Sequence, residues 1–128
     1  MRKEAENWLK QAESDLRNAE YLFKNHAYDV ASFLSHQAAE KSLKSYLLEV
    51  KKEIPLKTHN LKEYSDAAEC PIDVSIALRD LTPHYIVSRY PDASGGVPFE
   101  LYTENTAKEL IAKSKKVLDW VKKKLKVS

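Results

Sequence analysis

The sequence predicts an all-α protein, a single domain over residues 1–128 folded as an antiparallel bundle of four or five helices. Three long stretches show apolar residues at steps of three and four, the spacing of a helix with one buried face. Glycine occurs only twice, as Gly95-Gly96, whereas β-rich folds need glycine in frequent turns. A chain of 128 residues with 43% hydrophobic and 31% charged residues can bury one core.

The first two predicted helices are long and closely linked. One covers residues 2–24, with its apolar residues on one stripe and glutamates and lysines on the opposite face. After the polar break Asn25-His26, the second covers residues 27–50, and its apolar residues form more than one stripe. Two long helices joined by so short a link must lie antiparallel. We therefore expect the second helix to be central and to contact neighbours on two sides.

A loop and a shorter helix follow. Residues 51–58, which contain Pro55, are predicted to be a loop because proline interrupts the helical pattern. The third helix is predicted over residues 59–68. Its start can be capped by Thr58, or by Asn60 with a glutamate three residues later.

The second half of the chain is predicted to hold two more helices around an irregular stretch. A fourth helix follows Pro71, with Asp73 as its cap, and is ended or kinked by Pro83. Residues 90–102, rich in proline and glycine, form the only long irregular stretch, and such loops are more often functional than idle. The last helix covers residues 104–126 in clean helical register.

Composition limits the location and the kinds of site. Cys70 is the only cysteine, so no intrachain disulfide can form and a reducing compartment is expected. There is no apolar signal segment and no apolar run long enough to cross a bilayer. We therefore expect a cytoplasmic protein without membrane contact. With four scattered histidines and no glycine-rich phosphate loop, neither a metal nor a cofactor is expected.

The net charge of +2 is unevenly distributed along the chain. Residues 103–128 carry eight lysines against three acidic residues, whereas residues 25–102 are net acidic. Such a basic helix would attract phosphate groups. The alternative is that these lysines answer the helix dipole and solvate the outer face. We favour the alternative, because a pI near 8.5 is below the range usual for nucleic-acid-binding domains.

Polar residues at helical spacing stand out in the second predicted helix. His36, Glu40 and Lys44 follow one another at steps of four, and Lys41 lies beside them. One interpretation is an exposed ladder of ion pairs, each worth about 0.3 kcal/mol. The other is an ordered polar network that lines a groove between helices. Spacing alone favours the ladder, because such ladders are common on exposed helix faces.

A second cluster of functional residue types lies within residues 79–92. Arginine binds phosphate through two hydrogen bonds, histidine titrates near neutral pH, and tyrosine stacks on bases. For Arg79, His84 and Arg89 this functional interpretation competes evenly with a structural one, in which the arginines form salt bridges. Tyr85 is interpreted as a core or interface aromatic.

Four short motifs, in order and with fitting spacing, together resemble one known family. They are Trp8 with Ala12-x-x-Asp15-Leu16-x-x-Ala19, Gln37-Ala38-Ala39-Glu40-Lys41-x-Leu43-Lys44, Thr58-His59-x-Leu61 and Ser88-Arg89-Tyr90-Pro91-Asp92. The family is HEPN, the higher eukaryotes and prokaryotes nucleotide-binding domain. The resemblance implies an antiparallel bundle of four or five helices that forms a homodimer. In prokaryotes it also implies a frequent partner, a small nucleotidyltransferase encoded nearby, as in toxin–antitoxin pairs.

The resemblance also implies a candidate ribonuclease site that needs no metal. Many HEPN members cleave RNA with an arginine, a polar residue after it, and a histidine four to six residues further on. Arg79, Asp80 and His84 fit this form. In this interpretation His84 takes the proton from an RNA 2′-hydroxyl, Arg79 stabilises charge on the phosphate, and Asp80 orients one of them.

A binding module without catalysis is the interpretation that we favour slightly. Such a module would hold RNA or a nucleotide, or dock a nucleotidyltransferase. The Gln-Ala-Ala-Glu-Lys and Arg-Tyr-Pro-Asp motifs resemble the HEPN branch in which nuclease activity is less evident. The branch modified by its partner transferase has a tyrosine two positions after the histidine, where this chain has Ile86. The residues expected to form the binding groove are Lys41, Lys44, Arg89 and Tyr90.

Overall fold

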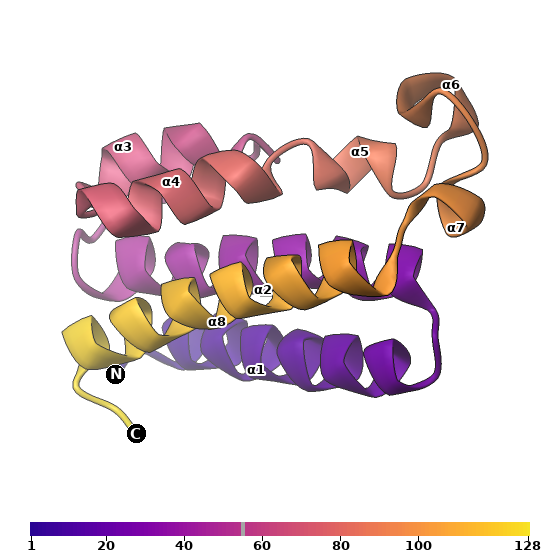
Figure 1. The fold of residues 1–128 in the computed structure, drawn as a ribbon. Helices are drawn as coiled ribbons and strands as arrows, with labels where there is room; N and C mark the ends of the chain where they lie inside the picture. The colour runs from indigo at the N-terminus through magenta and orange to yellow at the C-terminus, as the bar shows by residue number, and fades with distance from the viewer. Residues whose placement is uncertain (55) are drawn as a thin grey trace.

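Three helices of 22 residues form the frame of the computed structural model, which describes residues 1–54 and 56–128 (Figure 1). They are α1 (Lys3–Lys24), α2 (Tyr28–Glu49) and α8 (Glu104–Leu125). Helix α2 runs antiparallel to α1, and α8 packs on both while running in the direction of α2 (Figure 1). No strand occurs among the described residues. The predicted all-α bundle and the bounds of its long helices are confirmed.

Two shorter helices, α3 (Leu61–Ala68) and α4 (Ile72–Leu81), pack over this frame. Helix α3 contacts α2 and α4, and α4 also contacts α8. The side chain of Asn60 accepts a hydrogen bond from the backbone N–H of Lys62 at 3.0 Å, which confirms one of the two predicted caps. Pro55, in the predicted loop, lies outside the described residues.

The start of α4 differs from the prediction. Pro71 is the N-cap residue, and Asp73 lies within the first helical turn. Asp73 is therefore not a cap, although its carboxylate in the first turn still interacts favourably with the positive end of the helix dipole. The predicted interruption at Pro83 is confirmed, because α4 ends before it and the short helix α5 (His84–Val87) begins after it.

The predicted irregular stretch, residues 90–102, holds two further short helices. They are α6 (Pro91–Ser94) and α7 (Pro98–Leu101), each with proline at its first position. Proline favours the start of a helix because its φ is already helical and its missing N–H is not needed there. Gly95 ends α6 with a left-handed φ of 76°. The prediction was wrong here because these prolines start helices instead of breaking them.

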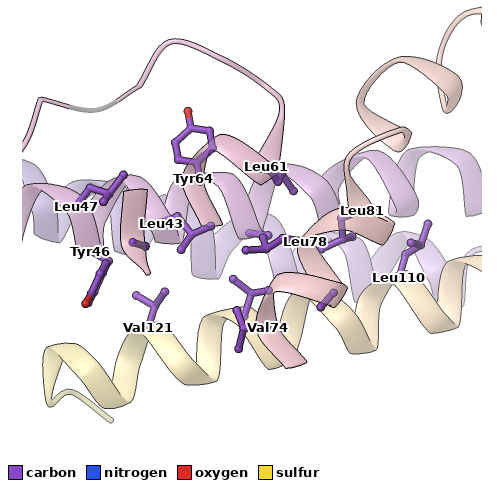
Figure 2. Packing of buried hydrophobic residues seen from close by; sticks show 14 of the residues in the cluster. Leu43, Tyr46, Leu47, Leu61, Tyr64, Val74, Leu78, Leu81, Leu110 and Val121 are labelled. Carbon is purple, nitrogen blue, oxygen red and sulfur yellow. The ribbon is translucent and has the colours of Figure 1, made fainter. Parts of the chain in front are cut away.

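The hydrophobic core lies between α2, α3, α4 and α8 (Figure 2). Helix α2 is buried on several sides, as expected of a central helix. None of the described helices is both long enough and apolar enough to cross a membrane. The labelled core residues in Figure 2 are Leu43, Tyr46, Leu47, Leu61, Tyr64, Val74, Leu78, Leu81, Leu110 and Val121.

Candidate functional site

A buried polar network lies on the side of α2 that faces the start of α3. His36 is 0% and Glu40 is 2% exposed. One oxygen of Glu40 accepts a hydrogen bond from Nδ1 of His59 at 2.8 Å, and the other lies 3.3 Å from Nζ of Lys44. The favoured prediction of an exposed ladder was therefore wrong. The ordered network of the alternative is confirmed, because neighbours cover α2 where a solvated face was expected, while a groove lined by this network stays a prediction.

The buried side chain of His36 fixes the backbone of His59. Its Nε2–H donates to the backbone carbonyl of His59 at 2.9 Å, and the amide of Gln37 lies 3.2 Å from its Nδ1. Since a carbonyl only accepts, the proton of this imidazole must be on Nε2. Burial lowers the pKa of His36 to about 4, so the ring is neutral at pH 7.

The two predicted lysines lie close to α1. Nζ of Lys41 donates to Asp15 at 2.6 Å, and the amide of Gln11 donates to the other oxygen of that carboxylate at 2.9 Å. Asp15 is only 5% exposed, so Lys41 compensates a buried charge. Nζ of Lys44 lies 4.7 Å from the ring centroid of Trp8. Both lysines are thus engaged at the boundary between α1 and α2.

Arg89 and Tyr90 belong to an aromatic surface that also includes Phe33, His59 and Tyr85. The imidazole of His59 stacks on the ring of Tyr85, with centroids 3.8 Å apart and planes 10° apart. The guanidinium carbon of Arg89 lies 4.4 Å from the ring centroids of Phe33 and Tyr85, and 5.1 Å from that of Tyr90. Its Nε donates to the carbonyl of Tyr85 at 2.8 Å. We call these five residues the Arg89 surface.

An open hollow of about 400 Å³ lies beside the guanidinium of Arg89. This volume is within the range of small-molecule binding pockets, about 300 to 1,000 Å³. Tyr85 is half-buried and Tyr90 is 49% exposed, so aromatic rings are available at the wall of the hollow. The residues that line it are Tyr85, Ile86, Arg89, Tyr90, Asp92 and Ala93.

The candidate ribonuclease residues lie on two different helices. The side chain of Arg79, on α4, is 73% exposed, and its Nε is 3.6 Å from Asp80. Asp80 is also 3.8 Å from Nζ of Lys113 on α8. His84, at the start of α5, is hydrogen-bonded through Nδ1 to the hydroxyl of Tyr102 at 2.5 Å. Among the described residues, no hydrogen bond or ion pair joins Arg79 to His84.

His84 has properties that suit a proton acceptor. Burial lowers its pKa, and the positive charge of Lys113 lowers it further, while Asp80 acts in the opposite direction. Burial raises the pKa of Tyr102 to about 12, so the hydroxyl keeps its proton at neutral pH. Tyr102 and Phe33 were not predicted as site residues. Neither carries a sequence signal of its own, because each joins its partners only through tertiary packing.

The described residues contain no group of three or more His, Cys, Asp or Glu side chains arranged to hold a metal ion. The contacts that hold the polar network and the Arg89 surface are hydrogen bonds, ion pairs, aromatic stacking and cation–π contacts. The two share His59, which is hydrogen-bonded to Glu40 and stacks on Tyr85.

A sequence model described as "HEPN domain" matches residues 5–124. The chain belongs to the HEPN family. This HEPN chain is similar to "Putative toxin MJ1304" of Methanocaldococcus jannaschii, with 28% identity over 138 aligned positions that cover 97% of this chain and 90% of that protein. The resemblance identified from the sequence motifs is thereby confirmed.

Two crystal structures resemble this HEPN chain over nearly its whole length. One is of ST0689, described as an archaeal HEPN homologue, with a TM-score of 0.83, 37% identity, and coverage of 96% of this chain and 98% of that one. The other is of TT1696 from Thermus thermophilus, with a TM-score of 0.88, 30% identity, and coverage of 96% and 99%. The arrangement of helices described above is thus shared with solved structures.

Proposed function

We propose that this HEPN protein is a toxin-like cytoplasmic module that binds RNA or a nucleotide at the Arg89 surface and works with a separately encoded nucleotidyltransferase. The observation that carries the proposal is the guanidinium of Arg89, held among three aromatic rings beside an open hollow. Only its Nε is hydrogen-bonded within the described residues, so its terminal N–H groups can bind phosphate. The similarity to a protein named as a toxin supports the toxin-like assignment.

Each part of the surface has a role in this proposal. Arg89 binds a phosphate, and the exposed ring of Tyr90 stacks on a base, a contact worth about 1 to 3 kcal/mol. Lys44 supports the site indirectly, because it pairs with Glu40, which in turn holds His59. Lys41 acts in this proposal only by holding α1 and α2 together, because its ion pair with the buried Asp15 leaves no net positive charge for a ligand.

Binding of a labelled single-stranded oligoribonucleotide tests this function. Arg89→Ala should weaken binding at least tenfold, because a charge-assisted hydrogen bond contributes about 1.5 to 3 kcal/mol. Arg17→Ala is the matched control, since Arg17 is also exposed but lies on α1. Fluorescence anisotropy measures both affinities. Equal loss in the two variants would show that binding is only non-specific attraction to positive charge.

The proposed partners can be tested separately. We expect a homodimer to cover the exposed apolar side chains at α7, which are Val97, Phe99 and Leu101. Light scattering at micromolar concentration should report twice the chain mass, and a clean monomer would contradict the dimer. We expect a nucleotidyltransferase gene beside the gene for this chain, and co-expression of the two proteins should give a co-purifying complex. Recovery of this chain alone would contradict that partnership.

A metal-independent ribonuclease is the second candidate function. The observation that favours it is His84, which is half-buried, has a lowered pKa and lies near the charged groups of Asp80 and Lys113. His84 would accept the 2′-hydroxyl proton, and Asp80 would orient Arg79, with which it is paired. The guanidinium of Arg79 would stabilise charge on the phosphate, in a cleft shared across the dimer.

Cleavage of single-stranded RNA in EDTA tests this candidate. The parent should cleave, and His84→Ala and Arg79→Ala should each lower the rate at least a hundredfold, within the range typical for such groups. Circular dichroism must show that both variants keep their helices. If the parent does not cleave RNA at high concentration, the ribonuclease function is wrong and only the binding function remains.

A further inference from the structure

Glu40 and His59 form a carboxylate–histidine pair that the proposed function does not use directly. Glu40 is 2% exposed, whereas the side chain of His59 is 46% exposed. The hydrogen bond of 2.8 Å between them therefore connects the protein interior to its surface. The backbone of His59 is also fixed, because its carbonyl accepts the hydrogen bond of the buried His36. A side chain held at both ends is preorganised for contact with a ligand.

The pairing determines which nitrogen of His59 carries the proton. A carboxylate can only accept a hydrogen bond, so Nδ1 of His59 must be the donor to Glu40. In the neutral ring, Nε2 then has no proton and carries a free lone pair. Nε2 of His59 has no hydrogen-bond partner among the described residues. The neutral imidazole of His59 thus presents one unused hydrogen-bond acceptor, Nε2.

Nε2 of His59, within the Arg89 surface, lies on the part of the ring that neither Glu40 nor Tyr85 contacts. One edge of the imidazole contacts buried Glu40, and one face stacks on Tyr85, so the exposed part of His59 is the other face and the edge that carries Nε2. The guanidinium carbon of Arg89 lies 4.4 Å from the ring centroid of Tyr85, and the ring centroid of His59 lies 3.8 Å from it. The distance between the guanidinium carbon and the imidazole centroid therefore cannot exceed the sum of these two distances. The sugar and phosphate of one nucleotide can bridge such a distance.

We propose that His59, held by Glu40, accepts a hydrogen bond from a ribose 2′-hydroxyl and so makes the Arg89 surface prefer RNA to DNA. This proposal rests on the binding function proposed for Arg89. The 2′-hydroxyl is the group by which a protein distinguishes RNA from DNA, and its hydrogen matches the free lone pair of Nε2. Arg89 and Tyr90 contact phosphate and base, which RNA and DNA share, so they cannot make this distinction.

Three oligonucleotides of one sequence test the proposal by fluorescence anisotropy: ribo, 2′-deoxy and 2′-fluoro. Fluorine keeps an RNA-like sugar pucker but cannot donate a hydrogen bond, so the 2′-fluoro probe separates the hydrogen bond from sugar shape. The parent should bind the ribo probe about three- to tenfold more tightly than either of the others, the range for one hydrogen bond. His59→Phe keeps a ring on Tyr85 but removes the acceptor. It should lower affinity for the ribo probe to that for the 2′-fluoro probe, so that the variant no longer prefers the ribo probe.

The outcomes separate this proposal from the binding function. If the parent binds the ribo and 2′-fluoro probes equally, or if His59→Phe keeps the ribo preference, the role of His59 is wrong while binding at Arg89 stands. If the parent binds none of the probes, the binding function itself is wrong.

Because His59→Phe leaves Glu40 with one partner fewer, nitrogen NMR of the parent provides a test without substitution. Nε2 of His59 should be unprotonated in the neutral ring and should shift on addition of the ribo probe but not the 2′-fluoro probe. A proton on Nε2 would overturn the proposal.

Discussion

The buried His36 makes a quantitative prediction about stability and pH. Its pKa in the folded protein is lowered to about 4, whereas an exposed histidine in the unfolded chain titrates near 6.5. Between these two values the unfolded chain binds a proton that the folded chain excludes. The contribution of His36 to the free energy of unfolding should therefore be constant above about pH 6.5 and fall as the pH drops toward about 4. Linkage with these two pKa values gives a loss of about 2 kcal/mol between pH 7.5 and pH 5.

His36→Gln isolates this contribution. The amide of glutamine can still donate to the carbonyl of His59, but it does not titrate. Urea unfolding followed by circular dichroism at pH 7.5 and pH 5 gives the pH-dependent loss for each protein. The parent should lose about 2 kcal/mol more than the variant. Other titrating groups, including His84, are present in both proteins and cancel in the comparison. An equal loss in parent and variant would refute the argument that burial keeps His36 neutral.

Three further substitutions test the packing and the buried charges, all by urea unfolding at pH 7.5. Leu43→Ala should lower stability by about 3 kcal/mol, because Leu43 is 0% exposed and its removal leaves a cavity; a loss under about 1 kcal/mol would contradict its place in the core. Lys41→Met should also cost about 3 kcal/mol, because it leaves the buried carboxylate of Asp15 without its cation; an unchanged stability would mean that the pair is solvated. Ser114→Ala should leave stability unchanged or raise it by about 1 kcal/mol, since its hydroxyl is buried without a hydrogen-bond partner among the described residues; a clear loss would contradict this.

The sequence predicted the long helices well because their signals are local. The period of apolar residues depends on each helix alone, so residues 2–24 and 104–126 were placed within one residue of α1 and α8. Asn60 was predicted as a cap for the same reason, since a cap acts on the turn that follows it. Local patterns are sufficient where the structure depends on neighbours in the chain.

The candidate site was predicted less completely because it depends on contacts between helices. The ladder on α2 was placed at the surface, since spacing does not show which faces of a helix other helices cover. His59 and Glu40 are 19 residues apart, and no periodicity links them. Tyr85 was interpreted as a core or interface aromatic, and the sequence did not show that its half-buried ring stacks on His59. Arg89 and Tyr90 were identified from residue chemistry, and the structure adds the aromatic neighbours that hold them.

The Arg89 surface joins parts of the protein with very different numbers of neighbours. Phe33 belongs to α2, which is packed against α1, α3, α5 and α8, whereas Tyr90 caps α6, which packs chiefly on α5 and α7 at one end of the bundle (Figure 1). Backbone amides of α2 should therefore exchange their hydrogens only on global unfolding, while those of α6 exchange through local opening. A ligand that spans Arg89 and Tyr90 would slow exchange in α6 and leave α2 as it was. The proposed binding surface would thus combine residues of a tightly packed helix with residues of a segment that opens locally.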